Sequence, residues 1–284
     1  MNFKRYFFVF ILAIILYGVT CAPTVLWQDS GMYQYRTWQH DIRGGLGLAL
    51  AHNLYFFIAI IFSKIPFGDF AYKVNFLSAI CGAFTVANVF FLVYLITEKG
   101  SSAVIGALTM VFSHTLWQHS NIAEVYSMYT AFFSAELIIL FLFIKFRQSK
   151  YLYWLGFVNG LSISVHMFGV IPLFCYLCLA GYYVVKKEIK FKIILFAFLL
   201  WLVGFLPYAY LIIEHFIKTQ DLTLTINSAL FGSGYSGNVL SSSFTVRMFF
   251  ENILFIGLNF ATPNILLLFV GISVFCKTEY KHVS

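Results

Sequence analysis

The chain has few charged residues: Asp, Glu, Lys and Arg make up 10% of its 284 residues, whereas hydrophobic residues make up 61%. Average soluble proteins contain about 25% charged residues. So little charge cannot cover the surface of a water-soluble globule of this size, and it also excludes a disordered chain. A bilayer-spanning helix needs about 20 mainly apolar residues. The sequence therefore predicts an all-α, polytopic membrane helical bundle with room for about eight spans.

Several motifs are also absent from the sequence. It contains no Walker loop, no GxGxxG, no GxSxG and no HExxH, which argues against nucleotide-driven transport, hydride transfer and zinc proteolysis. Its five cysteines have no disulfide-framework spacing, and the CxxC of Cys175 and Cys178 lies in an apolar run, where packing is the expected role. No spacing of carboxylates demands a divalent ion, although carboxylates are the ligands that such an ion would use. No cofactor is predicted.

The apolar runs predict a first span that is not cleaved as a signal peptide, followed by seven more. One long run, 151–185, would reach about 52 Å as a single helix, far beyond the roughly 30 Å hydrocarbon core. It would also place Lys150 and Lys186 on opposite faces of the membrane. We therefore expect a hairpin of two short spans with its turn near 166–172. The eight predicted spans cover about 6–21, 74–96, 103–118, 122–144, 151–169, 170–185, 193–213 and 252–275.

The net charge of +7 reports orientation in the membrane. With the N-terminus in the cytoplasm, twelve basic residues fall on the cytoplasmic side and six on the outer side, in agreement with the positive-inside rule. We predict that both termini are cytoplasmic and that the other face is extracytoplasmic, in a bacterial inner membrane or the endoplasmic reticulum. The excess of positive charge is then no indication of a nucleic-acid partner.

Two outer segments are too polar or too short to span. Residues 23–73 are predicted to form a long outer loop, in which 52–63 is an apolar helix of the length that lies in the membrane interface. A second short interfacial helix is expected within 32–45, broken by Gly44 and Gly45. The segment 214–250, rich in Ser, Thr, Gly and Asn, is predicted to be a flexible loop.

Three ionisable residues from separate stretches of the chain are predicted to meet at the outer surface. They are Asp29, just beyond the first span, Glu124, before the fourth, and His166, at the outer turn of the hairpin. Each has a structural alternative: the two carboxylates could cap helices, and the histidine could be a packing residue. Glu136 lies within the fourth span and is expected to face the bundle interior and pair with a polar neighbour.

Several segments resemble a family of membrane proteins that belongs with the GT-C fold glycosyltransferases and includes a eukaryotic O-mannosyltransferase. The run APTVLWQDSG at 22–31 is similar to the family's APT-x-x-W-x-DSGE opening, and AEVYSM at 123–128 is similar to its AEVYSLN segment. The resemblance covers about residues 1–215. Weaker matches follow in the expected order: IPFGD at 65–69, KVNFLSA at 73–79, SHTLW at 113–117 and GLSISVH at 160–166.

The resemblance implies transfer of a sugar from a polyprenyl-phosphate-linked donor to an acceptor hydroxyl on a protein or glycan, at the extracytoplasmic face. Asp29 matches the acidic residue that serves as base, and Glu124 would be the second acidic residue of the site. His166 would bind the donor phosphate or a sugar hydroxyl. The cations expected to neutralise the lipid phosphate are Arg36, Arg43 and Lys73. The other residues expected to bind substrate are Trp27, His52 and Tyr126.

The sequence departs from the family at two places. Met32 replaces the Glu of the DSGE motif, and His52 is followed by Asn53-Leu54-Tyr55 where the family has HPPGYPLY. A single membrane domain is expected, with a core module at 1–215, an outer loop at 216–250 and a last span with a short tail at 251–284. A lipid-linked-sugar carrier on the same scaffold, or a truncated, inactive family member, stays an alternative to the transferase.

Overall fold

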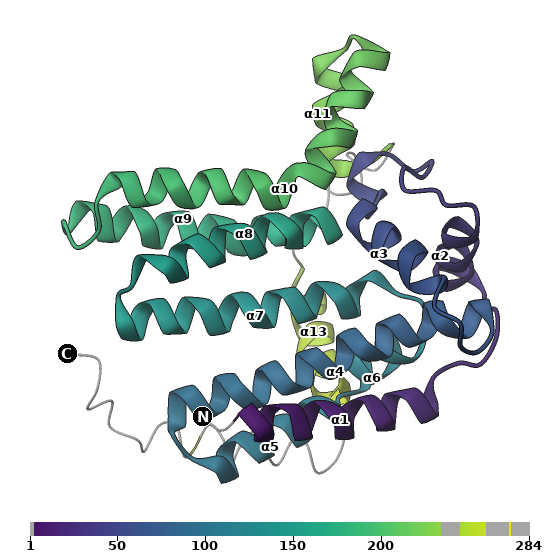
Figure 1. Ribbon diagram of the computed structural model, residues 1–284, viewed down its shortest axis with the longest axis horizontal. Coiled ribbons are helices and arrows are strands. Elements are labelled where there is room, and N and C mark those ends of the chain that lie inside the picture. Colours follow the sequence, from purple (N-terminus) through teal and green to yellow (C-terminus); the bar gives the residue numbers. More distant parts are fainter. Residues whose placement is uncertain (1–2, 234–244, 260–272, 274–284) are drawn as a thin grey trace.

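The protein is described from a computed structural model in which residues 3–233, 245–259 and 273 are placed. In this part of the chain all regular elements are helices, which confirms the predicted all-α class. Figure 1 shows the long helices lying side by side, with the short helices α2 and α3 gathered at one end of them. The chain is therefore a helical membrane bundle with additional short helices at one end.

Among the placed residues, five helices are long and apolar enough to cross a membrane. The predicted number of eight spans is not confirmed. Helix α8 (Ser149–Val165) is one residue shorter than the shortest of the five. The predicted span 252–275 lies mostly outside the described residues; only α13 (Val246–Asn259) enters it. The five helices are α1 (Phe3–Thr20), α4 (Phe70–Thr97), α7 (Val125–Phe146), Met167–Val185, which contains α9 (Val170–Val185), and α10 (Phe191–Thr219).

The predicted span 103–118 is wrong, because the chain breaks there into two short helices, α5 (Gly100–Val111) and α6 (His114–Asn121). The Tyr17 hydroxyl donates to the carbonyl oxygen at the end of α5 (3.0 Å), and extended backbone at Ser113 starts α6. Neither helix has the roughly 20 residues that a crossing needs. His114, expected in the middle of a span, is an exposed residue at the start of α6.

The hairpin predicted within 151–185 is confirmed. Helix α8 ends at Val165, the 3-10 helix η2 (Met167–Gly169) makes the turn, and α9 returns. The distant ends of the two helices meet in one apolar cluster, which contains Leu152 and Tyr183. The turn places His166 at the same end of the bundle as the start of α7, because both chain segments reverse there (Figure 1).

The first outer segment folds into short helices, as expected. Helix α3 (Asn53–Ser63) confirms the short helix predicted at 52–63. Helix α2 (Gln28–Trp38) begins four residues before the predicted 32–45 and ends before the glycine pair. The 3-10 helix η1 (Leu48–Leu50) follows, after Gly47 with a φ of 92°, a conformation that favours glycine.

The flexible loop predicted at 214–250 is wrong for its first part, and also for 246–250, which belong to α13. Helix α10 continues to Thr219, and Asp221 then caps α11 (Leu222–Phe231) by accepting from the N–H of Leu224 (2.9 Å). Beyond Pro207 the end of α10 turns away from the bundle and α11 packs beside it (Figure 1), since proline removes a helical hydrogen bond. Residues 234–244 lie outside the described part of the chain.

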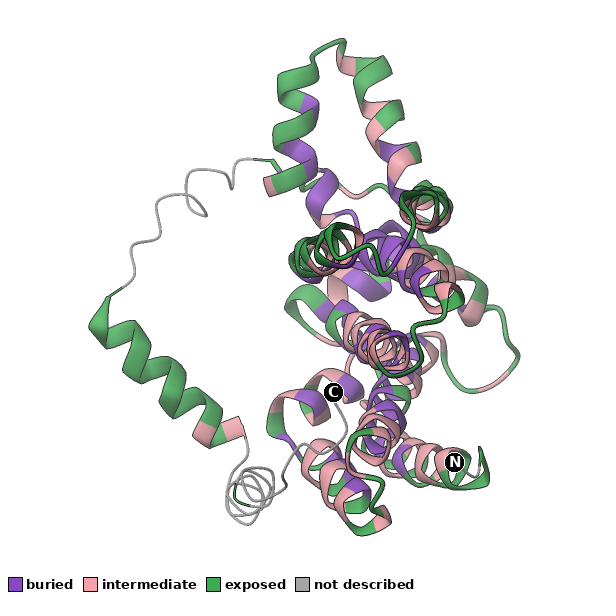
Figure 2. Ribbon diagram, turned by 90° about the vertical axis from the view of Figure 1, so that its left-hand side faces the viewer, coloured by how far each residue is buried: buried purple, intermediate pink, exposed green. Residues whose placement is uncertain are grey.

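Two helix packings hold the bundle together. Helix α4 lies at the centre of one half and packs against α1, α5, α6 and α7, and in Figure 2 burial follows the middle of the bundle. In the other half, α8 and α10 approach closely where glycines face backbone: a Cβ at Gly160 would meet the carbonyl oxygen of Trp201, and one at Gly204 would meet that of Phe157. Small residues allow this approach in membranes, where packing replaces the hydrophobic effect.

The two ends of the bundle differ in charge. At the end opposite α2 and α3, Lys145 pairs with Glu98 (2.9 Å) and Arg147 with Glu188 (3.9 Å). Between the ends, Glu136 is fully buried and its carboxylate accepts from Asn159 (3.3 Å) and Tyr176 (2.9 Å), which confirms that it faces the interior and pairs with polar neighbours. The basic turns therefore meet at one end, away from the short helices.

Candidate active site

Asp29 lies in the first turn of α2, on a segment that leads out of α1. It is exposed, and so is Trp27, which precedes the helix and has 91% of its surface accessible. Gln34 holds this segment in place: its side-chain oxygen accepts from the N–H of Leu26 (3.0 Å). A carboxylate in the first turn of a helix is stabilised by the unpaired N–H groups there. Asp29 is thus presented to solvent on a fixed backbone.

Glu124 is buried at the N-cap of α7 and has extended backbone. Its carboxylate accepts from the N–H of Val125 (3.2 Å), while its own N–H donates to the Ser78 hydroxyl on α4 (3.1 Å). The predicted capping role is therefore present. The cap uses only one carboxylate oxygen of Glu124, and capping alone does not explain why the side chain is buried.

Asn75 connects the segments that carry the two carboxylates. This buried residue of α4 donates to the carbonyl oxygens of Ala22 (2.8 Å) and Thr24 (3.1 Å). Its side-chain oxygen accepts from Gln34 of α2 (2.8 Å) and from the N–H of Ala123, directly before Glu124 (3.0 Å). The sequence patterns predicted no role for Asn75, Ser78 or Gln34. The available signal was an Asn and a Ser three residues apart in an otherwise apolar span.

His52 and His166 form a stacked pair beside this cluster. Their ring centroids are 4.9 Å apart and the ring planes differ by 16°. His52 has a φ of 49°, which is uncommon for a residue other than glycine, and its Nδ1 lies 3.0 Å from the carbonyl oxygen of Val165, next to His166 in the chain. Burial lowers the pKa of His52 to about 3 and that of His166 to about 4.

Aromatic rings join the histidines to the carboxylates. Tyr126 is the second residue of α7. Its ring centroid lies 5.3 Å from that of His166, and its hydroxyl interacts electrostatically with both Glu124 and Asp29. The ring centroid of Tyr33 on α2 lies 6.1 Å from that of His52. The Tyr33 hydroxyl also interacts electrostatically with both carboxylates. The structure therefore brings Asp29, Glu124 and His166 to one place, with His52 and Tyr126 between them.

The environment of Glu124 changes its chemistry. Burial, together with the negative charge of Asp29, raises the pKa of Glu124 to about 7. The same two carboxylates, after burial, raise the pKa of Tyr33, which stays protonated. Two neighbouring carboxyl groups, one exposed and one buried with a raised pKa, are typical of sites that move protons.

Arg36 is buried near this cluster but is already engaged. Its guanidinium donates to the carbonyl oxygen of Ala51 (3.0 Å), pairs with Asp41 (3.3 Å) and lies 3.7 Å from the ring centroid of Phe56. A side chain at Gly44 would collide with the guanidinium. Arg36 thus holds the outer loop against α3.

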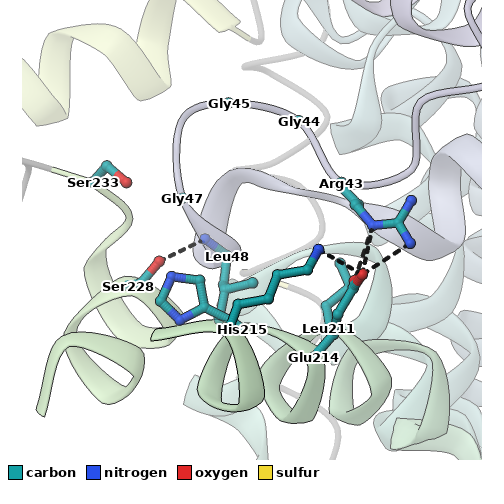
Figure 3. Close-up of a pocket in the computed structure, with 11 residues that line it drawn as sticks. Arg43, Gly44, Gly45, Gly47, Leu48, Leu211, Glu214, His215, Ser228 and Ser233 are labelled. Carbon is teal, nitrogen blue, oxygen red and sulfur yellow. Dashed lines mark hydrogen bonds and ion pairs between the residues drawn. The ribbon is translucent and has the colours of Figure 1, made fainter. Parts of the chain in front are cut away.

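Arg43 is engaged elsewhere, in a two-pronged ion pair with Glu214 of α10 (2.9 and 3.0 Å). Figure 3 shows Arg43 pointing at Glu214 below the glycine-rich turn. The two line a separate cavity of about 270 Å³. Lys73 donates to the carbonyl oxygen of Ile65 (3.3 Å), beside α4. The structure thus places neither Arg43 nor Lys73 in a contact with the paired carboxylates.

The segment that departs from the family is ordered and buried. Asn53, which stands where the family has proline, donates from its side-chain nitrogen to the carbonyl oxygen of Pro207 and so ties α3 to α10. The described residues contain no group of three or more His, Cys, Asp or Glu side chains arranged to hold a metal ion.

Comparison with known proteins identifies relatives of the chain. A family model described as the protein O-mannosyl-transferase TMEM260 N-terminal domain matches residues 48–190, half of the chain. The mouse (Mus musculus) protein O-mannosyl-transferase TMEM260 is 26% identical over 173 residues, which are 58% of this chain and 24% of the relative. The chain thus matches about a quarter of the length of that relative. No solved structure matches.

Proposed function

The chain belongs to the family of the protein O-mannosyl-transferase TMEM260 N-terminal domain, and from this premise we propose that it is a membrane glycosyltransferase. It takes a sugar, mannose by the name of the relative, from a polyprenyl-phosphate-linked donor. The acceptor is a hydroxyl group, on a protein Ser or Thr. The reaction takes place at the extracytoplasmic face, where the end of the bundle with α2 and α3 lies.

The observation that carries this proposal is the pairing of an exposed and a buried carboxyl group. Asp29 and Glu124 come from separate stretches of the chain, and Asn75 bonds to the segments on both sides. The burial of Glu124 and its interaction with Asp29 raise its pKa to about 7, the range in which a carboxyl group exchanges protons at neutral pH. Capping of the two helices does not require the two carboxyl groups to lie close together, so their proximity favours a role in chemistry.

In the proposed step, Asp29 is the general base. It accepts the proton of the acceptor hydroxyl as that oxygen forms a bond to the anomeric carbon of the sugar. The bond between the anomeric carbon and the phosphate oxygen breaks, and its electron pair leaves with the polyprenyl phosphate. Asp29 is suited to this role because it is exposed and can be reached by an acceptor as large as a protein.

Glu124 is proposed to orient the acceptor or the sugar from the buried side. A carboxyl group with a pKa near 7 can be protonated and donate a hydrogen bond, while its other oxygen caps α7. Trp27 and Tyr126 offer apolar faces to the sugar at the mouth of the site. Of the three candidate cations, Arg36 is the one that interacts with His52, and it is proposed to lower the charge of the leaving phosphate. Like Arg43 and Lys73, it would have to give up some of its present contacts to do so.

Transfer of a labelled sugar from a purified polyprenyl-phosphate donor tests the proposal. Asp29→Asn should reduce the rate by about 100- to 10,000-fold, the usual contribution of a general base. Asp69→Asn is the matched control: Asp69 is an exposed carboxylate at the N-cap of α4, and its removal should leave the rate unchanged.

Two outcomes would contradict the proposal. If Asp29→Asn retained the wild-type rate, the assignment of the base would be wrong. If the wild-type chain moved the lipid-linked sugar across vesicle membranes and transferred it to no acceptor, the carrier alternative would replace the transferase.

A further inference from the structure

The backbone determines where the proton of His52 lies. Its Nδ1 is 3.0 Å from the carbonyl oxygen of Val165, and a carbonyl oxygen can only accept a hydrogen bond. Nδ1 must therefore carry the proton. In a neutral imidazole the other ring nitrogen, Nε2, is then an acceptor.

The neighbouring ring has the opposite arrangement. The backbone N–H of Phe168 donates to His166 Nδ1 (3.1 Å), so this nitrogen carries no proton. A neutral imidazole then has its proton on Nε2, which becomes a donor. Two stacked rings thus show complementary nitrogens: His52 Nε2 accepts and His166 Nε2 donates.

Both rings are neutral at physiological pH. They are buried, with 5% and 8% of their surfaces accessible, and desolvation disfavours the charged form of each. The guanidinium of Arg36 further opposes a charge on His52, as would a charge on its partner ring. The pair therefore offers a ligand one hydrogen-bond donor and one acceptor, without a charge of its own.

The two Nε2 atoms are open to a ligand. Neither has a hydrogen-bond partner among the described residues, yet neither is fully enclosed. The enclosed side-chain polar atoms without a hydrogen bond in that part of the chain are Arg36 Nε, which is ion-paired with Asp41, the Tyr55 hydroxyl, His119 Nδ1, Glu136 Oε1 and Ser162 Oγ. The ring centroids are 4.9 Å apart, which is less than two hydrogen bonds of about 2.9 Å placed end to end. The two rings are therefore close enough for one small polar group of a ligand to approach both of them.

We propose that this histidine pair is a hydroxyl-recognition site that binds one hydroxyl group of the donor sugar and does not bind its phosphate. The hydroxyl accepts from His166 Nε2 and donates to His52 Nε2. An oxygen of a phosphate diester can only accept hydrogen bonds. It would accept from His166 Nε2, but its lone pairs would face the lone pair of His52 Nε2. This inference rests on the proposed function, since it assigns the sugar end of the same donor.

Matched variants separate this role from folding. His52→Asn and His166→Asn each keep a side-chain atom at the position of Nδ1, so that the bonds to Val165 and Phe168 are retained while Nε2 is removed. His40→Asn is the control, because His40 is an exposed histidine outside the pair. Thermal unfolding of the three variants checks that all are folded.

The first measurement is equilibrium binding to detergent-solubilised full-length chain. Wild type should bind polyprenyl-phosphate mannose more tightly than polyprenyl phosphate alone. Both pair variants should lose most of this difference. Their affinity for polyprenyl-phosphate mannose should fall by about 10- to 100-fold, as expected when a buried hydrogen-bonding site is left unpaired. Their affinity for polyprenyl phosphate should equal that of wild type. Equal weakening for both ligands would assign the pair to the phosphate and overturn the inference. If the variants bound both ligands as wild type does, the inference would also be overturned.

The second measurement uses a series of donors in which one sugar hydroxyl at a time is replaced by hydrogen. Wild type should discriminate most strongly against one of them, and both pair variants should lose discrimination against that same donor and no other. If no single donor stood out, the inference would be wrong. If wild type transferred no sugar but bound the donors with this pattern, the proposed transferase function would fail and the inference would stand.

Discussion

At the scale of single residues, the site depends on polar side chains whose environment changes their chemistry. Glu124 is an N-cap residue, a common structural role, yet its burial and its proximity to Asp29 give it a pKa of about 7. His52 and His166 are anchored through one ring nitrogen each, which leaves the other free for a ligand. A side chain can therefore serve the fold with one atom and the reaction with another.

The raised pKa of Glu124 predicts how stability depends on pH. Between about 4.5, the pKa in the unfolded chain, and about 7, the folded chain holds more protons, so the free energy of unfolding falls as pH rises. The total loss is about 3 kcal/mol, and it is complete above pH about 7. Glu124→Gln, which keeps an oxygen for the cap, should remove this slope and be more stable than wild type at pH 8. Thermal unfolding of both from pH 4.5 to 8 tests this; parallel curves would contradict it.

Asn75 is predicted to matter for activity beyond its effect on stability. Asn75→Ala removes the hydrogen bonds to the backbone of Ala22 and Ala123 and one of those of Gln34, and should cost about 3 kcal/mol. Asn88→Ala is the matched control, because Asn88 is a buried residue of the same helix, bonded to Tyr6 and Ser134. Both should lower the unfolding temperature, but at a temperature where both are folded only Asn75→Ala should lose sugar transfer. Equal activity of the two variants would mean that Asn75 has a purely structural role.

At the scale of elements, short connections decide where the site lies. The turn η2 brings His166 back to the start of α7, and the break between α5 and α6 leaves a short helix, α6, that leads directly into Glu124. Helices α8 and α10 are held in close contact by glycines that face backbone, so the position of α8 and its terminal histidine depends on that contact.

A single methyl group should disturb this helix contact. At Gly160, alanine would place its Cβ against the backbone of α10 and force the helices apart, at a cost of about 1–3 kcal/mol. At Gly181, on α9, the same substitution meets open space and should cost nothing. Unfolding temperatures of Gly160→Ala and Gly181→Ala in the same detergent test this difference. A similar small effect at both positions would show that α8 and α10 can separate freely.

At the scale of the whole molecule, the bundle has two unlike ends, one with paired carboxylates and histidines and the other with basic turns. Arg147 and Lys145 pair with Glu188 and Glu98 across three such turns. An end with an excess of basic residues is retained in the cytoplasm. The predicted orientation therefore places the candidate active site outside.

Cysteine labelling tests this orientation. In a chain whose own cysteines are replaced by alanine, Gly45→Cys, at an exposed position of the outer loop, should react with a membrane-impermeant maleimide in intact cells. Gln148→Cys, exposed in the turn between α7 and α8, should react only after permeabilisation. The reverse pattern would place the candidate site in the cytoplasm and remove the support for an extracytoplasmic reaction.

Much of the fold could be predicted because it depends on local composition. The length of apolar runs predicted a helical membrane bundle, and excess length together with the positions of Lys150 and Lys186 predicted the hairpin of α8 and α9. One prediction failed at a contact from a distant segment, and another failed where a local helix cap outweighed the composition of the segment. The Tyr17 bond to Val111 accompanies the break in the expected span at 103–118, and the cap at Asp221 starts a helix where composition favoured a loop.

The sequence by itself determined that the chain is a membrane protein and that Asp29, Glu124 and His166 lie at the same end of the helical bundle. The reason is that the length of the apolar runs and the order of the turns decide which residues lie at the same end. Only the tertiary structure decided how they interact. Asn75 joins four segments, and His52 bonds to the residue that precedes His166, 113 positions later in the chain. Such contacts depend on the packing of helices distant in sequence, and therefore no local pattern contains them.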